Sequence, residues 1–533
     1  MDDYATQDEN MDLVHSPYLS PGPSSNLANM DQYSSGFQSA AQSTLPSTLP
    51  SSSSTPINYT PQPPSYQMPL PPPPPLPPQP RPQSPNAIIS ELSPAQVMSE
   101  LEVFMNDSDW KVQTNACFFL YCLLIDEKRG EKFCELVAAS DEILNTVYYI
   151  LENDDYMNKF LDTFRNLTAC LTCLSQYPDV RVALLRRGSN QATTGLGALI
   201  KSLRSRDGTV AIYTITAIHN LLLDRRYEIL EEAKNQVKKF GGLPYIVQLL
   251  GIAFDEALDK QCPINNYKFK VVVLDCIQIL AWGDMENRLV IRESEGPKLI
   301  LSNIEDNFDQ QSEDLIETAS RVLKCLSTCT ANKKDIIDNG GIQVLYKCIL
   351  RNNQEILRTC LWTLRNLSDE INTTVKNEGN LISRLVQRLL LILQEYAKEP
   401  CIITCALGTL ANLTCNNEPI KKSVCDFNGI NLIMDAVDVS LGILYRSNLH
   451  VHNLQNQIMD IDILDPAVYA LCHLLNQAHY DQIEDARESV QRRFDLFKPL
   501  IQNSRAINED LAREVEKLHN FAFGYSVPAF HYQ

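Results

Sequence analysis

Basic side chains are almost absent from the first 86 residues of this sequence. Arg81 is the only one there, against six acidic residues, and the 533-residue chain carries a formal net charge of −19. Such an acidic chain lacks the bulk positive charge with which nucleic-acid-binding proteins attract phosphates. We therefore expect no direct binding of nucleic acid, although a local basic groove on an acidic body stays compatible with this composition.

Long apolar runs are also absent. No stretch of about 18 uncharged apolar residues occurs, so no membrane-spanning helix is expected. The N-terminus, MDDYATQDEN, is acidic and has no apolar segment of the kind that secretory signals contain. All 16 cysteines lie after residue 116, in apolar segments. These features predict an intracellular protein without membrane insertion, whose cysteines are reduced and buried.

The sequence lacks the common catalytic motifs. It contains no Gly-rich phosphate loop, no GxSxG and no HExxH. Cys170 and Cys173 form a CxxC, but this pair lies in an apolar helical segment without a second pair, which favours core packing over metal binding. His450 and His452 have no evident third ligand. We therefore expect neither an enzyme nor a bound cofactor or metal.

What the sequence does contain begins with a tail rich in serine and proline. Residues 1–86 hold 20 of the 30 prolines and few of the branched aliphatic residues that a core needs. Such a segment is predicted to be disordered. Its tract 69–82, PLPPPPPLPPQPRP, predicts polyproline II because no helix tolerates so many prolines.

From about residue 90 the sequence consists of amphipathic helical runs that contain a repeated phrase. The copies are FLYCLL (119–124), TFRNLT (163–168), AIHNLLL (217–223), DCIQILAWG (275–283), RVLKCLS (321–327), TLRNLS (363–368), TLANLT (409–414), ALCHLL (470–475) and KLHNFA (517–522). We call the position of the Asn in RNL the phase residue. It falls at Cys122, Asn166, Asn220, Ile279, Cys325, Asn366, Asn412, His473 and Asn520.

The spacing of these phase residues has a base period of 41–47 residues, which is typical of armadillo or HEAT units of two or three helices. Longer intervals predict insertions near 251–266 and 438–462, as loops on the outside of the stack. Glycine-containing turn signals separate the copies at 241–250, 296–304, 340–349 and 428–437, where Gly is expected to supply a positive φ.

The repeat predicts an all-α fold: a right-handed superhelical solenoid of about nine repeats over 90–525, with 526–533 as a short C-terminal tail. The third helix of every repeat then lines one concave groove, so the recurring Asn forms a row of side-chain amides. Such a row can bond the main chain of an extended peptide. The alternative for each Asn is a hydrogen bond inside its own helix.

The phrases CLWTLRNLSD (360–369), LANLTCNN (410–417), SRVLKCLS (320–327), DCIQILAWG (275–283) and IHNLLL (218–223) resemble the beta-catenin family. The resemblance covers about residues 95–525 in register. It implies an armadillo-repeat solenoid with a basic groove for extended acidic segments. The partners that it implies are cadherin cytoplasmic tails, T-cell factor/lymphoid enhancer factor, axin and adenomatous polyposis coli proteins.

The resemblance also implies the residues of the peptide-binding groove. Lys421 corresponds to the family's most important lysine, and Arg288 takes the place of a second lysine. The full set of expected groove residues is His219, Asn220, Lys268, Trp282, Arg288, Lys333, Trp362, Arg365, Asn366, Asn412, Lys421 and His473.

The sequence departs from the family pattern in several places. Cys472, beside His473, replaces an arginine, and Ala512 aligns with an expected lysine, so the C-terminal end of the groove is expected to be less basic. The sequence stops after repeat nine, so three repeats and the acidic activation tail are expected to be missing. The family's alpha-catenin helix would fall on residues 65–86, where proline prevents a helix, so alpha-catenin binding is expected to be weak or absent.

The tail also contains a serine ladder within residues 33–51. Its candidate phosphorylation sites, which are spaced four residues apart, are Ser35, Ser39, Ser43 and Ser47. The ladder resembles the family's destruction box, on which glycogen synthase kinase acts. Ser34 stands where the family has an acidic residue, which leaves recognition by a ubiquitin ligase open.

Two roles follow from the resemblance. The first is a non-enzymatic scaffold of Wnt signalling and transcriptional regulation, which the missing activation tail would turn into a non-activating competitor. The second is a cell–cell adhesion adaptor on cadherin tails with little alpha-catenin linkage. An importin-alpha-like receptor is disfavoured, since Trp362 and Asn366 form the only WxxxN pair of the kind it needs. We expect a monomer in cytoplasm and nucleus, recruited to adherens junctions.

Overall fold

The structure is a computed structural model that describes residues 93–186, 193–252, 266–308, 312–374, 379–447, 454–476, 483–497 and 509–524. Helices account for the regular structure of these ranges, and no β-sheet occurs in them. The predictions for the tail 1–86, with its serine ladder and polyproline tract, and for residues 526–533 lie outside the described residues. The same holds for most of the expected insertion at 251–266.

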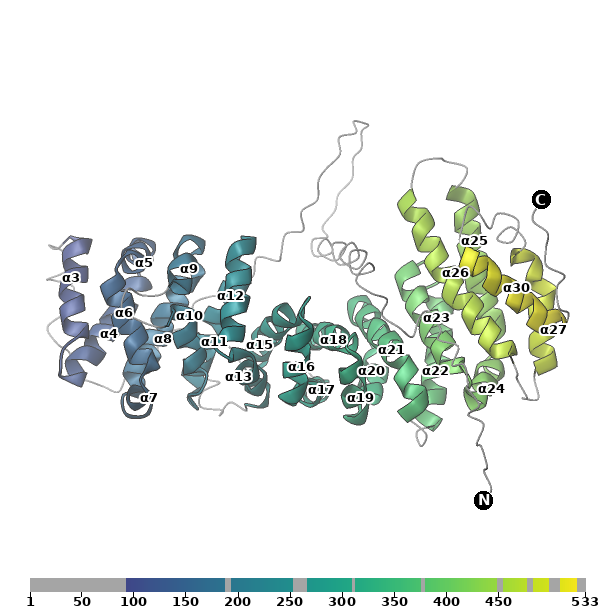
Figure 1. Cartoon of the computed structure of the whole chain (residues 1–533), viewed down its shortest axis with the longest axis horizontal. Coiled ribbons are helices and arrows are strands. Elements are labelled where there is room, and N and C mark those ends of the chain that lie inside the picture. Colours follow the sequence, from purple (N-terminus) through teal and green to yellow (C-terminus); the bar gives the residue numbers. More distant parts are fainter. Residues whose placement is uncertain are drawn as a thin grey trace, which may run out of the picture. The chain divides into compact units, whose positions relative to one another are not determined.

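The phase residue of every repeated phrase lies in a helix, which we call the third helix of its repeat. These helices are α4 (Trp110–Leu124), α8 (Leu161–Gln176), α11 (Gly208–Leu222), α15 (Asn266–Ala281), α18 (Glu313–Ser327), α21 (Gln354–Thr374), α23 (Pro400–Thr414), α26 (Leu454–Leu475) and α30 (Glu509–Phe523). Each of them except α30, the last, packs against the third helix that follows it along the chain (Figure 1).

The remaining described helices connect and support the third helices. They are α3 (Pro94–Met105), α5 (Gly130–Ala139), α6 (Asp141–Glu152), α7 (Asp154–Lys159), α9 (Pro178–Leu185), α10 (Gly195–Ser202), α12 (Tyr227–Lys239), α13 (Gly242–Gln248), η2 (Leu249–Gly251), α16 (Met285–Glu293), α17 (Gly296–Asp306), α19 (Thr330–Asp338), α20 (Gly341–Cys348), α22 (Gly379–Glu395), α24 (Glu418–Asp426), α25 (Gly429–Ser447), α27 (Ile483–Arg493) and η3 (Phe494–Phe497). We call them the outer helices. None of the described helices has both the length and the apolar character that a membrane span requires.

The repeated phrase marks the core of the stack. The leucine that follows the phase residue is 0% exposed in six copies, at Leu167, Leu221, Leu326, Leu367, Leu413 and Leu474. Burying one such side chain contributes about 1.5–3 kcal/mol. The pair Cys170 and Cys173 lies in the same layer of α8, and both side chains are buried, as expected for core residues.

The turns that precede α13, α17, α20 and α25 show which of their residues requires glycine. The residue with positive φ is Gly241 or Gly340 in two turns but Glu295 or Asn428 in the other two, so the prediction that Gly supplies this conformation is wrong for half of them. The glycine common to all four is the next residue. At Gly296 a Cβ atom would lie 2.6 Å from the Ile291 carbonyl oxygen, so close helix approach explains this glycine.

The second expected insertion is largely helical. Helix α25 continues to Ser447 and α26 begins at Leu454, so only residues 448–453 of the expected loop 438–462 fall outside described helices. The extra residues therefore lengthen two helices, which is a correction to the loop prediction.

We predict opposite effects for two adjacent substitutions at the turn before α17. Glu295→Gly should raise the free energy of unfolding by about 0.5–1 kcal/mol, because glycine adopts a positive φ without strain. The substitution also removes the ion pair of Glu295 with Lys298, but this exposed pair contributes little to stability. Gly296→Ala should lower the free energy of unfolding by about 1–3 kcal/mol, because the added Cβ atom would clash with Ile291. Urea unfolding followed by circular dichroism measures both changes, and a larger loss for Glu295→Gly would contradict this account.

Candidate peptide-binding groove

One face of helices α15, α18 and α21 is open to solvent. Counted from the phase residue, positions −8, −4, −1 and +3 share one helix face because they are separated by three or four residues. From Leu315 to Thr328 in and after α18, the partly exposed residues are those four positions and no others. The same positions are partly or fully exposed in and after α15 and in α21. We call this surface the open groove face.

The residues of the open groove face are mostly charged or aromatic. They are Val271, Asp275, Gln278 and Trp282 from the α15 repeat, Glu317, Arg321, Lys324 and Thr328 from the α18 repeat, and Arg358, Trp362, Arg365 and Asp369 from α21.

Positions −8, −4 and −1 are closed on the neighbouring third helices α11 and α23. In α11, Thr216 and His219 are 3% and 6% exposed, and in α23 the corresponding Ala411 is 1% exposed. Some of these positions are exposed again toward the ends of the stack, as at Asp162 and Arg165 of α8. Among the described third helices, all four positions are open only on α15, α18 and α21.

Trp362 lies between two cations at the centre of this face. The Nζ atom of Lys324 is 5.3 Å from the centroid of its ring, and the guanidinium of Arg365 is 5.2 Å from it. Each such cation–π contact contributes about 0.5–2 kcal/mol, depending on desolvation. Arg365 lies across Gly408, where a Cβ atom would be 2.8 Å from the arginine Nε. The tryptophan and the glycine together fix the position of Arg365.

Lys324 has no acidic partner among the described residues, unlike Arg321, Arg358 and Lys333. It forms no ion pair with any residue that the structure describes. Burial lowers the pKa of Lys324 below its usual value, which shows that its ammonium is partly desolvated without a compensating carboxylate.

Three of the other cations near Lys324 are neutralised from within the protein. Arg321 lies 2.7 Å from a Glu317 oxygen. Arg358 lies 2.9 Å from Glu355, and Lys333 lies 2.8 Å from Asp369. Lys324 and Arg288, which bonds neutral oxygen atoms, form no ion pair with any described residue, so their charges are available to a ligand.

Six of the groove residues predicted from sequence lie on or beside the open groove face. Lys268 and Trp282 are exposed, and Arg288, Trp362, Arg365 and Asn366 are half-buried. Arg288 is held by hydrogen bonds that it donates to the Ala281 carbonyl (3.0 Å) and the Thr328 hydroxyl (2.8 Å).

The predicted principal lysine, Lys421, lies inside the protein. Its side chain is 4% exposed, and its ammonium donates hydrogen bonds to the Asn476 carbonyl (2.9 Å) and to Glu418 (3.0 Å). His473 is similarly engaged, with Nδ1 2.8 Å from the Ala411 carbonyl oxygen. In this structure Lys421 and His473 connect α23, α24 and the end of α26, and do not present their polar atoms to the groove.

The recurring asparagines join neighbouring repeats. Asn220, Asn366 and Asn412 each donate an Nδ2 hydrogen bond of 2.9 Å to a serine of the preceding repeat: Ser175, Ser327 and Ser368, respectively. Each serine hydroxyl in turn donates to the carbonyl three residues before it. We call each of these pairs an Asn–Ser rung. The rungs link one third helix to the next, which differs from both uses expected for these amides.

His219 is a buried base at the edge of this region. Its Nε2 lies 3.8 Å from an Asp275 oxygen. Burial, followed by the charge of Arg181, lowers the pKa of His219 to about 4, and burial raises the pKa of Asp275 to about 6. The imidazole is therefore neutral at pH 7 and acts as an interior residue.

Sequence reasoning missed three cations of the open groove face: Arg321, Lys324 and Arg358. A signal was present in the sequence. Arg321 and Lys324 lie four and one residues before the phase residue of α18, and Trp362 and Arg365 lie at the same two positions in α21. Comparing equivalent positions across all repeats would have found them.

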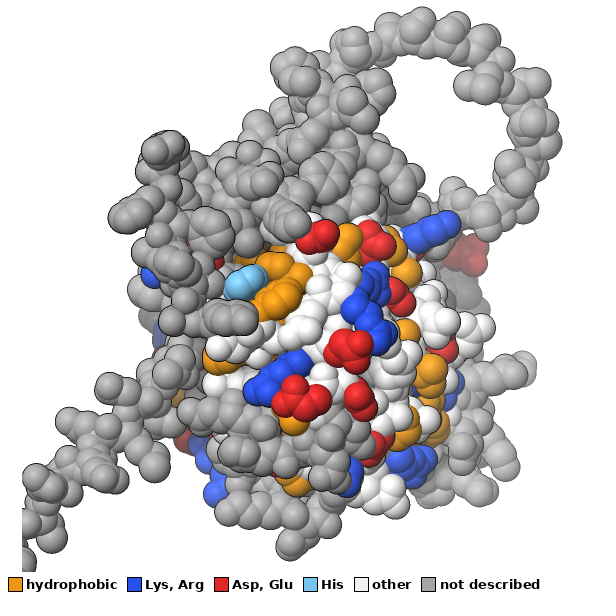
Figure 2. All heavy atoms as spheres, turned by 90° about the vertical axis from the view of Figure 1, so that its right-hand side faces the viewer, with side chains coloured by type: hydrophobic (Ala, Val, Ile, Leu, Met, Phe, Trp, Pro, Cys, Tyr) orange, Lys and Arg blue, Asp and Glu red, His pale blue; other side chains and the backbone are white. Residues whose placement is uncertain are grey.

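The C-terminal end of the described stack has no field of one sign. Figure 2 shows basic and acidic side chains interspersed there, with a small hydrophobic group beside a histidine. Arg493 pairs with Asp435 at 2.6 Å, and Lys517 pairs with Glu514 at 2.6 Å. Ala512 is buried. The expectation that the C-terminal end of the groove is less basic stays a prediction from sequence.

We predict that the Asn–Ser rungs contribute measurably to stability. Ser368→Ala removes the acceptor of the buried Asn412 amide and should lower the free energy of unfolding by about 1–2 kcal/mol. Ser327→Ala should cost less, because its donor Asn366 is half-buried and water can replace the hydroxyl. Urea unfolding of both variants measures the difference, and equal or zero losses would contradict the role of the rungs.

We also predict that His219 makes the fold sensitive to acid. An unfolded histidine binds its proton near pH 6.5 and folded His219 near pH 4, so the folded state loses stability as the pH falls between these values. His219→Gln should remove a slope of up to about 1.4 kcal/mol per pH unit. Asp275 has the opposite slope, because its folded pKa is raised, so Asp275→Asn should make the acid loss steeper. Parallel stability–pH curves for both variants and the wild type would refute this prediction.

Comparison with known proteins identifies relatives of this stack. Residues 329–369, which contain α19, α20 and most of α21, match the Armadillo/beta-catenin-like repeat. Junction plakoglobin of Rattus norvegicus is 33% identical over 403 residues, which is 75% of this chain and 46% of plakoglobin. Catenin beta of Urechis caupo is 31% identical over 75% of this chain and 42% of its own length. The chain thus spans less than half the length of these curated relatives.

A solved structure agrees with this relationship at the level of the fold. It comes from work on a phosphorylation switch in the interaction between cadherin and beta-catenin, and it superposes with a TM-score of 0.60 at 22% identity, covering 80% of this chain and 68% of the other. The Armadillo segment polarity protein of Musca domestica is a further relative, 30% identical over 75% of this chain and 42% of its own length. These relatives are armadillo-repeat proteins and not enzymes, in agreement with the expected absence of catalysis. Plakoglobin, beta-catenin and Armadillo are thus homologues of this chain over three quarters of its length, and its fold is the armadillo-repeat solenoid.

Proposed function

We propose that the chain is a non-enzymatic scaffold that binds extended acidic segments of other proteins along the open groove face. The observation that carries this proposal is the arrangement of Lys324, Trp362 and Arg365. A partly desolvated ammonium without a carboxylate partner stands beside an aromatic ring and a second, fixed cation. This combination favours an acidic peptide with an apolar side chain that can rest on the ring.

The energetics support a peptide carboxylate at Lys324. A charged hydrogen bond in a half-buried place is stronger than one at the exposed surface, because water screens it less. Trp362 holds both cations near their binding positions, so less side-chain entropy is lost on binding. The paired cations, such as Arg321, would exchange one carboxylate for another and contribute to orientation more than to affinity.

We propose cadherin cytoplasmic tails as the first partners. The solved relative was studied in its interaction with cadherin, and plakoglobin is named for junctions. T-cell factor/lymphoid enhancer factor, axin and adenomatous polyposis coli proteins offer segments of the same acidic chemistry and are proposed as further partners. The chain would act as a monomer in the cytoplasm, at cell–cell junctions and in the nucleus.

Two roles remain within this proposal. As a signalling scaffold, the chain would occupy T-cell factor and compete with activating partners. As an adhesion adaptor, it would occupy cadherin tails, with weak or no alpha-catenin linkage. Two features of the tail lie outside the described residues. They are the polyproline tract, on which the expectation of weak alpha-catenin binding rests, and the serines Ser35, Ser39, Ser43 and Ser47. Regulated degradation and the lack of actin linkage therefore stay predictions from sequence.

We predict that Lys324→Gln weakens binding of an acidic cadherin-tail peptide at least tenfold, because it removes the uncompensated cation of the open groove face. The dependence of affinity on salt should also become shallower by one charge. Calorimetry at two salt concentrations measures both effects. The same titration with T-cell-factor-type and axin-type peptides would rank the proposed partners.

The matched control is Lys422→Gln, which removes an exposed lysine of α24 and should leave affinity unchanged. Lys421→Glu is not a suitable binding variant, because it would bury a second carboxylate beside Glu418 and destabilise the fold. Equal affinity of Lys324→Gln and the wild type, or equal loss in both lysine variants, would refute the groove assignment.

A further inference from the structure

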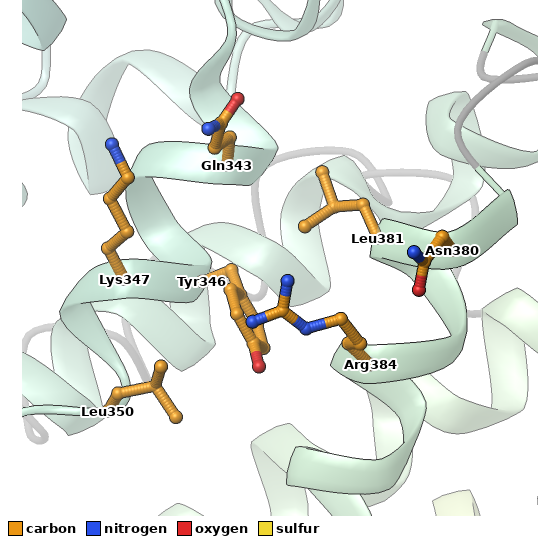
Figure 3. A pocket seen from close by; sticks show the side chains of 7 residues that line it. All are labelled: Gln343, Tyr346, Lys347, Leu350, Asn380, Leu381 and Arg384. Carbon is orange, nitrogen blue, oxygen red and sulfur yellow. The ribbon is translucent and has the colours of Figure 1, made fainter.

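A second surface with unpaired positive charge lies on the outer helices. Between α20 and α22 the surface encloses a pocket of about 430 Å³, lined by Gln343, Tyr346, Lys347, Leu350, Asn380, Leu381 and Arg384 (Figure 3). None of these residues belongs to a third helix or to the open groove face. The pocket is therefore separate from the site of the proposed function.

Arg384 is fixed in this pocket without an acidic partner. Figure 3 shows its side chain reaching from α22 toward Tyr346 on α20, and its guanidinium is 5.1 Å from the centroid of that ring. Arg384 is exposed and forms no ion pair within the described part of the chain. Its neighbour Arg388, one turn further along α22, is fully used: it pairs with Glu395 at 2.8 Å and bonds the Ile349 carbonyl.

The rest of the pocket combines a second cation with apolar surface. Lys347 borders the α20 side, and its ion pair with Glu305 is 3.0 Å long with both side chains at least 40% exposed. Such an exposed pair is worth only about 0–1 kcal/mol, so a ligand carboxylate can replace Glu305 at little cost. Leu350 is 51% exposed beside it. Leu381 lies across the pocket on α22 (Figure 3).

We propose that this outer pocket binds a short acidic segment of a partner protein in which an aliphatic side chain stands next to a carboxylate. The carboxylate binds Arg384, whose planar fork favours paired hydrogen bonds and is pre-oriented by Tyr346. The aliphatic side chain covers Leu350 and Leu381, which otherwise face water. Gln343 and Asn380 border the pocket and offer hydrogen bonds to the main chain of the segment.

A peptide fits this surface better than an anionic membrane does. A lipid headgroup needs several cations on one exposed plane, whereas here the neighbouring Arg388 is already neutralised by Glu395. Alternating charged and apolar contacts within one pocket match alternating side chains of an extended segment. Because the groove and the outer pocket lie on different helices, one chain can hold two acidic segments at once.

The test uses the full chain and a fluorescein-labelled peptide of sequence Asp-Leu-Asp-Glu-Leu-Asp, with Asn-Leu-Asn-Gln-Leu-Asn as the neutral control. Binding is measured by fluorescence anisotropy in a Lys324→Gln background, which reduces binding at the groove. Arg384→Gln should weaken the remaining affinity at least fivefold, and Leu350→Ser should weaken it about threefold. Lys398→Gln, an exposed lysine just beyond α22, should leave it unchanged.

Three outcomes would overturn the outer-pocket proposal: equal affinity of Arg384→Gln and its parent, equal binding of the neutral peptide, or preferential binding of phosphatidylserine vesicles that Arg384→Gln abolishes. Circular dichroism of each variant separates loss of binding from loss of fold. The two proposals fail separately, because Lys324→Gln compared with the wild type tests the groove, and Arg384→Gln compared with its Lys324→Gln parent tests the outer pocket.

Discussion

The third helix of one armadillo repeat cannot bury itself alone, and the rest of the structure depends on this constraint. Its apolar residues need a third helix on each side as well as the outer helices, so burial is completed only by stacking. The leucine after the phase residue is inaccessible in six copies, such as Leu367, for this reason. Once both flanks are covered, a single helix face is left over, and on α15, α18 and α21 it is the open groove face. The residues that stabilise the stack and those proposed to bind a peptide are therefore different residues of the same helix.

Much of this arrangement could be predicted from sequence because it is periodic. The repeat of 41–47 residues and the phrase ending in Asn-Leu located every described third helix. The state of individual cations could not be predicted in this way. Lys421 pairs with Glu418 and donates a hydrogen bond to the carbonyl of Asn476, 55 residues later, which holds it inside the protein, whereas Lys324 has no carboxylate partner within the described residues. Whether a lysine is available to a ligand depends on contacts that no local pattern records.

Backbone geometry was also only partly predictable from local sequence patterns. The glycine-containing turns were recognisable, but the sequence could not tell which residue adopts the positive φ, and Glu295 and Asn428 do so without being glycine. At three of the four turns the following glycine, Gly296, Gly341 or Gly429, lies too close to a backbone carbonyl for a Cβ atom, which depends on three-dimensional packing. Likewise, extra residues at 438–462 were expected to form a loop, yet they extend α25 and α26, because added helical turns can pack against helices already present.

The Asn–Ser rungs give the stack a polarity. In every rung the amide donor belongs to the later repeat and the hydroxyl acceptor to the earlier one. A serine without its asparagine still donates to its own helix, whereas an asparagine without its serine must donate to water or to another partner. The two faces of a repeat are therefore chemically different. The later face presents serine hydroxyls that are already bonded, and the earlier face presents amide donors that a preceding repeat must accept.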